Sequence, residues 1–129
     1  MRYEDVQEYI LLQDKFQARC EEVCGLLIPL NDSYKCLYDF EIYSDPDEVF
    51  GEGDEYWEYG GHEHHSAEFP LNFLWEDDEK IKQYVEDELK KREHAKIEER
   101  LRMEKLVEEA LEKRDREEYE RLKAKFGGV

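Results

Sequence analysis

The chain has 129 residues, of which 43% are charged, and a formal net charge of −17 at pH 7. This length suits one modest domain with one core, and so high a charged fraction requires that much of the surface remain in water. The longest apolar run, VCGLLIPL at 23–30, is too short to span a bilayer, and three irregularly spaced cysteines do not fit a secreted disulfide scaffold. We therefore expect no membrane contact and a cytoplasmic location.

Residues 3–24 place apolar side chains at intervals of three and four, which predicts an amphipathic helix that ends at Gly25. LLIPL at 26–30 is expected to be a buried connector, and NDS at 31–33 is expected to be a turn. In YKCLYDFEIYS at 34–44, side chains alternate between apolar and polar, a pattern that predicts a strand.

DPDEVFGEGD at 45–54 is rich in turn residues and is therefore expected to be a loop. EYWEY at 55–59 and HEHHSAEF at 62–69 predict two further strands, which meet at a turn formed by Gly60 and Gly61. The three predicted strands define a small antiparallel sheet.

Residues 76–125 contain neither glycine nor proline, and a continuous helix of this length would run roughly 75 Å. Nine acid-to-base pairs at i and i+4 favour it, as in Glu76/Lys80 and Glu98/Arg102. The apolar rows do not keep a strict heptad, so they do not assure a long two-stranded coiled coil.

The expected fold class is α+β, with an N-terminal helix, a small antiparallel three-stranded sheet and a long charged C-terminal helix. Residues 1–75 would form an acidic α+β core domain, and 76–129 the long helix. We expect its first turns to pack on the sheet and the remainder to project or to form a homodimer through 97–126. The sequence leaves open whether the helix is continuous or breaks near 112–118.

The charge is distributed unevenly along the chain. Residues 1–75 contain 18 acidic and four basic residues, whereas 76–129 contain 18 and 15. Between Lys35 and Lys80 there are 15 Asp and Glu but no Lys or Arg. Because ordinary solvated surfaces mix both signs, this segment indicates a specialised surface.

Zinc ligands could come from three histidines in the predicted hairpin and three cysteines elsewhere, namely His62, His64, His65, Cys20, Cys24 and Cys36. Positions 62 and 64 would face the same side of a strand, but no spacing matches a compact zinc template. We therefore expect exposed imidazoles in an acidic field, without metal or cofactor. The cysteines are expected to be small buried hydrophobes.

The sequence contains no pattern that indicates catalysis. Carboxylates are abundant, but no two are marked as a tuned pair in a pocket. A cysteine–histidine nucleophile has no supporting flanking sequence, and no phosphate-cradling glycine loop is present. We expect a protein that is not an enzyme.

The run EYWEYGGHEHHSAEFPLNFLW, with the charged tail ending EEYERLKAKF, resembles small uncharacterised accessory proteins of bacteriophages and prophages. The resemblance implies a phage gene neighbourhood and, in that case, the cytoplasm of the host cell. Some phage accessory proteins block host defences by binding nucleic-acid-handling enzymes. The resemblance carries over no functional residue.

Two functions remain open. The chain could be a protein-binding module that imitates nucleic acid and occupies a basic host protein, while its own charge repels nucleic acid. Asp39 and Glu41, about 6.6 Å apart on one strand face, have a spacing comparable with charges along a nucleic-acid strand. Alternatively, it could be an assembly protein that self-associates through the long helix, with its acidity serving solubility. The residues expected to bind the partner are Asp39, Glu41, Asp45, Asp47, Glu48, Glu52, Asp54, Glu55, Trp57, Glu58 and Tyr59.

Overall fold

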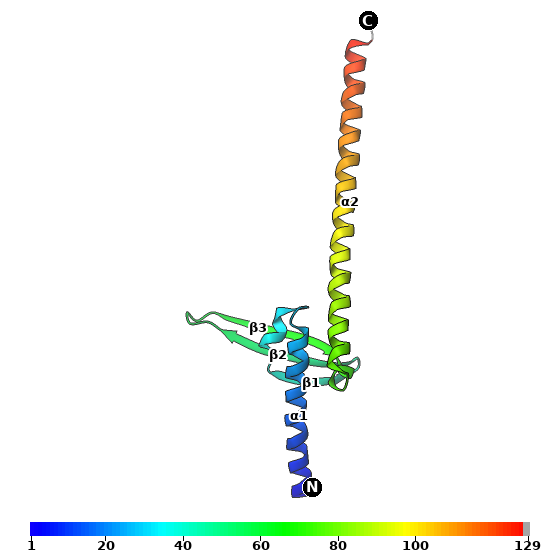
Figure 1. Ribbon diagram of the computed structural model, residues 1–129. Coiled ribbons are helices and arrows are strands. Elements are labelled where there is room, and N and C mark those ends of the chain that lie inside the picture. Colours follow the sequence, from blue (N-terminus) through cyan, green and yellow to red (C-terminus); the bar gives the residue numbers. More distant parts are fainter. Residues whose placement is uncertain (128–129) are drawn as a thin grey trace. The chain divides into compact units, whose positions relative to one another are not determined.

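The computed structural model describes residues 1–127, and the chain divides into two units, 1–89 and the residues from 90 onward. The elements in chain order are α1 (Tyr3–Leu27), η1 (Asp32–Cys36), β1 (Asp39–Ser44), β2 (Asp47–Tyr56), β3 (His62–Pro70), η2 (Leu71–Leu74) and α2 (Asp78–Phe126). The strands form an antiparallel sheet in the order β1-β2-β3 (Figure 1). The predicted α+β class is confirmed.

The second strand differs from its prediction, because β2 includes most of the segment that was expected to be a loop. Gly51 and Gly53 made that segment look like a turn, yet both are buried within the strand. A Cβ on Gly51 would lie 2.8 Å from the Phe40 ring, and one on Gly53 would lie 1.9 Å from the Cys36 carbonyl oxygen. The two glycines therefore mark close approach of neighbouring groups to the strand.

The turn between β2 and β3 is longer than the predicted two residues. It spans 57–61, and the Trp57 N–H donates to the Gly61 carbonyl at 2.9 Å. Gly60 has a φ of 81°, a left-handed conformation that glycine adopts without a steric penalty. The predicted EYWEY strand is therefore wrong beyond its first two residues.

α1 continues past Gly25, where its end was expected, and finishes at Leu27. Leu27 is fully buried in the core, which favours a helix long enough to place it there. Pro29 follows two residues later, and because it has no N–H it cannot donate the next hydrogen bond of the helix. Leu26 and Leu27 therefore belong to the helix. The expected buried connector is reduced to 28–30 and is not buried, because Ile28 and Leu30 are half-buried and Pro29 is exposed.

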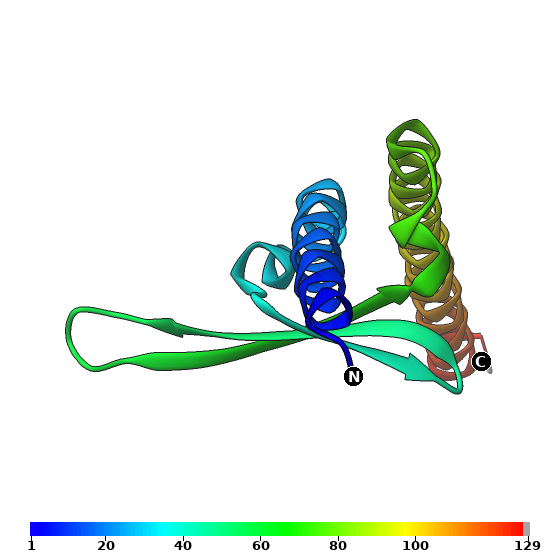
Figure 2. The ribbon, with the colours of Figure 1, turned by 90° about the horizontal axis from the view of Figure 1, so that it is seen from below.

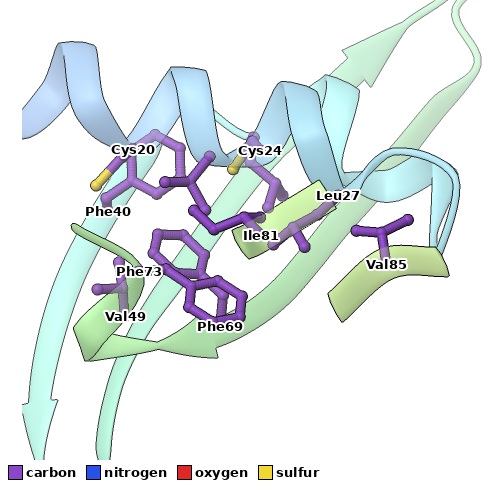
Figure 3. Close-up of a cluster of buried hydrophobic side chains, with 11 residues drawn as sticks. Cys20, Cys24, Leu27, Phe40, Val49, Phe69, Phe73, Ile81 and Val85 are labelled. Carbon is purple, nitrogen blue, oxygen red and sulfur yellow. The ribbon is translucent and has the colours of Figure 1, made fainter. Parts of the chain in front are cut away.

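The core of residues 1–89 lies between α1 and one face of the sheet (Figure 3). Its central members are Val23 and Leu27 of α1 and Val49 of β2, all essentially inaccessible. Ile81 and Val85, in the first turns of α2, are also buried in it. The first turns of α2 therefore contribute side chains to the core. The buried residues are Cys20, Val23, Cys24, Leu27, Leu37, Phe40, Val49, Phe69, Phe73, Ile81 and Val85.

Arg19 of α1 ties the helix to the segment between the sheet and α2. Its Nε donates to the Leu74 carbonyl at 3.1 Å, and Nη2 donates to the carbonyls of Phe73 and Glu76 at 3.1 and 2.7 Å. Nη1 forms an ion pair with Asp78 at 2.7 Å. This guanidinium therefore satisfies backbone oxygens that no strand or helix partner reaches.

α2 is continuous from Asp78 to Phe126, with no break near 112–118, and its residues from 90 to 126 are all exposed. Of the predicted pairs, Glu76–Lys80 is present at 3.2 Å, whereas Arg102 contacts Glu99 at 2.7 Å instead of Glu98. Such i, i+3 and i, i+4 contacts support a helix that has little core to pack against. Among the described residues, no helix combines the length and apolar character needed to cross a membrane.

Candidate functional site

The sheet has two unlike faces, because successive side chains of a strand point to opposite sides and cross-strand partners share a side. The inner face carries the core, and Figure 2 shows α1 on that side of the sheet. None of the side chains on the other face is buried. We call it the outer face, and the register assigns to it Asp39, Glu41, Tyr43, Glu48, Phe50, Glu52, Asp54, Tyr56, His62, His64, Ser66, Glu68 and Pro70.

The outer face is a lattice of carboxylates. Asp39 and Glu52 are direct cross-strand partners, and Glu41 and Glu68 flank Phe50 in the next row. Neighbouring strands lie about 4.8 Å apart, and alternate residues of one strand about 6.6 Å apart. None of the three strands contains a Lys or Arg. The carboxylates of this face are Asp39, Glu41, Glu48, Glu52, Asp54 and Glu68.

The structure separates the residues that were expected to bind a partner. Asp39, Glu41, Glu48, Glu52 and Asp54 share the outer face. Asp47 and Glu55 lie on the inner face, because they alternate with those side chains along β2. The rest occupy the turns, namely Asp45, Trp57, Glu58 and Tyr59.

Sequence reasoning missed the apolar centre of the outer face. The rings of Tyr43 and Phe50 lie 5.7 Å apart, and the Tyr43 hydroxyl donates to Glu41 Oε2 at 3.3 Å. Partial burial, followed by the nearby Glu41 carboxylate, raises the pKa of Tyr43. Glu68 was also missed, because only the β2–β3 register brings it beside the acids of β2.

Asp54 connects two of the hairpin histidines on the outer face. Its Oδ1 lies 2.8 Å from His62 Nε2 and 2.9 Å from His64 Nδ1. Hydrogen bonds from His64 and His62 hold the pKa of Asp54 below its usual range. The His62 ring also stacks on Tyr56, with centroids 4.8 Å apart. The predicted sharing of one side by positions 62 and 64 is confirmed.

The third histidine belongs to a different cluster on the inner face. His65 Nε2 lies 3.0 Å from Glu55 Oε2, and the Cys36 thiol donates to the same oxygen at 3.6 Å. Partial burial, followed by the hydrogen bond to Glu55, raises the pKa of Cys36. This grouping was not apparent from the sequence, because the three residues belong to three different elements.

The other two cysteines are core residues, as predicted. Cys20 and Cys24 are buried under the inner face, and burial raises the pKa of each thiol to about 12. At neutral pH both thiols are therefore protonated and apolar in character. Neither belongs to the group of neighbouring ligand-type atoms that includes Cys36. Of the six residues considered as zinc ligands, Cys36 and His65 lie together with Glu55 in a group of three ligand atoms within 4.8 Å of one another. His62 and His64 share only the Asp54 carboxylate.

Comparison of the chain with protein-family models, with curated proteins and with solved structures finds no match. The two faces of the sheet are therefore the features of this chain that bear on its function. These define an α+β protein with an uncovered acidic face and a second cluster of ligand-type side chains beneath the hairpin.

Proposed function

We propose that the protein is a non-enzymatic, acidic protein-binding module whose outer face docks on a basic surface of a nucleic-acid-handling protein. The observation that carries the proposal is the direct pairing of Asp39 with Glu52 on strands that contain no Lys or Arg. Like charges opposite one another lower stability, so their retention on one face favours a role in recognition.

The outer face supports protein docking in a second way. Tyr43 and Phe50 form an apolar contact within the carboxylate lattice, and Trp57 and Tyr59 are exposed at the hairpin turn. Aromatic residues are enriched in protein interfaces and often contribute most of the binding energy. A basic groove that normally holds phosphates would meet carboxylates at a similar spacing, with aromatic side chains to anchor the contact. Nucleic acid itself would be repelled.

Capture from a cell lysate on the immobilised full chain tests this function. The outer-face variant is Asp39→Lys/Glu41→Lys/Glu68→Lys, and it should capture much less of the basic partner. The matched control is Glu98→Lys/Glu109→Lys/Glu112→Lys, which changes the net charge equally on α2 and should bind like the wild type. Circular dichroism checks that both variants are folded.

Salt and nucleic acid provide the second test. Capture should fall between about 0.1 and about 1 M salt, because the screening length falls from about 10 to about 3 Å. Double-stranded DNA or RNA should displace the wild-type chain from the captured protein. Equal capture by the two charge variants, or failure of nucleic acid to compete, would refute the proposed function.

A second candidate function is self-association through residues 97–126. Its specific support is a row of exposed apolar side chains at intervals of four, Met103, Val107 and Leu111, each more than half exposed. Such a row forms an exposed apolar stripe on one face of the helix, on which a second helix could pack. Sedimentation of wild type and Val107→Glu/Leu111→Glu tests it, and a wild type that remains monomeric across the micromolar range would exclude it.

A further inference from the structure

The inner face of the hairpin holds three side chains of the types that bind zinc. They are Cys36 at the end of η1, Glu55 on β2 and His65 on β3, and one ligand atom from each lies within 4.8 Å of the others. All three residues are half-buried. Thiolate, imidazole and carboxylate are the ligands that zinc takes from proteins.

The distances within this cluster are close to those around a tetrahedral zinc. Bonds of about 2.3 Å to sulfur and about 2.0–2.2 Å to nitrogen and oxygen place neighbouring ligand atoms about 3.3–3.6 Å apart. The Cys36 Sγ lies 3.6 Å from Glu55 Oε2, and His65 Nε2 lies 3.0 Å from the same oxygen. Small side-chain adjustments would therefore produce a coordination shell.

His65 is oriented as a metal-binding histidine usually is. Its Nε2 faces the carboxylates, whereas its Nδ1 lies 3.1 Å from Ser33 Oγ. Such a histidine generally donates its second ring N–H to an outer-shell acceptor, which fixes the tautomer and the ring plane. Ser33 is itself positioned by its N–H, which donates to the Asn31 side chain at 3.0 Å.

A fourth ligand is within reach on β3, two residues before His65. Glu63 is the cross-strand partner of Glu55, and its Oε2 lies 3.7 Å from His65 Nε2. Two carboxylates opposite each other are destabilising unless a cation lies between them. A divalent cation would convert this repulsion into coordination by both.

The backbone is shaped to bring η1 to this place. Gly53 is the cross-strand partner of His65, and a Cβ at Gly53 would collide with the Cys36 carbonyl oxygen. The buried glycine thus permits Cys36 to approach the sheet beside His65. Gly53 favoured the prediction of a loop in this segment. In the structure it leaves the space in which Cys36, Glu55 and His65 come together.

We propose that Cys36, Glu55 and His65 bind a zinc ion, with Glu63 completing the coordination. The ion would clamp η1 to both strands of the hairpin and hold its aromatic turn in place, so the site is structural. Zinc is favoured over calcium and magnesium, because sulfur and nitrogen ligands suit it whereas those ions require oxygen. The sequence favoured exposed imidazoles without metal, and we retain that interpretation only for His62 and His64.

Metal titration of the full chain, first treated with a chelator under reducing conditions, tests the site. One Zn²⁺ per chain should bind, and Co²⁺ in its place should give a thiolate-to-cobalt charge-transfer band. Cys36→Ser should abolish that band. His65→Gln should weaken Zn²⁺ binding by at least the roughly 10- to 100-fold typical of outer-shell losses, and Ser33→Ala by about that amount.

The chain provides its own controls. His62→Gln and His64→Gln remove histidines from the same strand but from the outer face, and should leave Zn²⁺ affinity unchanged. Circular dichroism of the metal-free variants identifies any that fail to fold. In that case the Zn²⁺ affinities of Ser33→Ala and Glu63→Gln, at half-exposed and exposed positions, provide the test. Absence of a thiolate–cobalt band in the wild type would overturn the site. So would equal weakening by His64→Gln and His65→Gln, or equally tight binding of Ca²⁺.

Discussion

Asp39 of β1 and Glu52 of β2 are direct partners across the outer face, two like charges on strands that contain no Lys or Arg. Their repulsion lowers the stability of the fold, whereas the same two charges are proposed to bind the basic partner. We therefore expect Asp39→Lys to raise the free energy of unfolding by about 0.2–1 kcal/mol, the range for a favourable cross-strand pair. Urea denaturation at constant ionic strength measures this change.

The same substitution should weaken capture of the basic partner. Glu98→Lys is the matched control, because it changes the net charge equally on an exposed position of α2. We expect the control to alter neither stability nor capture appreciably. A lower stability for Asp39→Lys than for the wild type would show that repulsion across this pair is unimportant.

Two glycine-to-alanine substitutions should have opposite effects. At Gly53 the added Cβ would lie 1.9 Å from the Cys36 carbonyl oxygen, so Gly53→Ala should lower the free energy of unfolding by about 1–3 kcal/mol through overpacking. At Gly25, within α1, an added Cβ meets nothing within 4 Å, so Gly25→Ala should raise it by about 0.4–1 kcal/mol. Thermal or urea unfolding of both variants provides the comparison, and a neutral Gly53→Ala would contradict the close approach of η1 to β2.

Arg19 should be the most important charged side chain for the stability of residues 1–89. Arg19→Met removes its bonds to the carbonyls of Phe73, Leu74 and Glu76 together with the ion pair to Asp78. The free energy of unfolding should fall by about 2–4 kcal/mol, because hydrogen bonds to a charged group are worth more than neutral ones.

Two further variants test the cause of that loss. Arg19→Lys keeps the charge but not the planar fork of donors, so it should recover only part of the stability. Lys15→Met, at an exposed position of the same helix, should have little effect. Full recovery by lysine would mean that charge alone, and not the hydrogen-bond geometry, is responsible.

The three thiols should differ in reactivity in the metal-free protein. Burial raises the pKa of Cys20 and Cys24 from 9.0 to about 12, so at pH 8 their thiolate fraction is about 1,000-fold below that of an unperturbed cysteine. Because their pKa values lie well above neutral, the thiolate fraction of both cysteines rises with pH. Raising the pH should therefore accelerate their alkylation throughout the range in which the protein stays folded. Peptide mass spectrometry after iodoacetamide treatment measures each site.

Cys36 should be alkylated first, because it alone is half-exposed. In denaturant all three thiols should react at similar rates, which controls for intrinsic differences. Labelling of Cys20 or Cys24 as fast as Cys36 in the native protein would contradict their burial in the core.

Local patterns in the sequence were sufficient for the helices and for the fold class. The interval of three and four in residues 3–24 and the long segment without glycine or proline each predict a helix from local pattern. The end of α1 at Leu27 depends on the core. Alternation in 34–44 identified β1 only in its second half, because the strand begins at Asp39 and residues 34–36 belong to η1. The strand predicted at 62–69 matches β3. The core positions of Cys20 and Cys24 followed from the same periodicity.

The sheet's middle strand, the composition of its outer face and the ligand cluster were decided by tertiary structure. Gly51 and Gly53 favour a turn locally, but here they make room for Phe40 and Cys36 on the inner face. Register then determines which acids share a side, so Glu68 joins the acids of β2 while Glu55 turns away from them. The charge of this protein is thus a property of its sequence, whereas the arrangement of that charge depends on contacts between residues far apart in the chain, which local patterns do not encode.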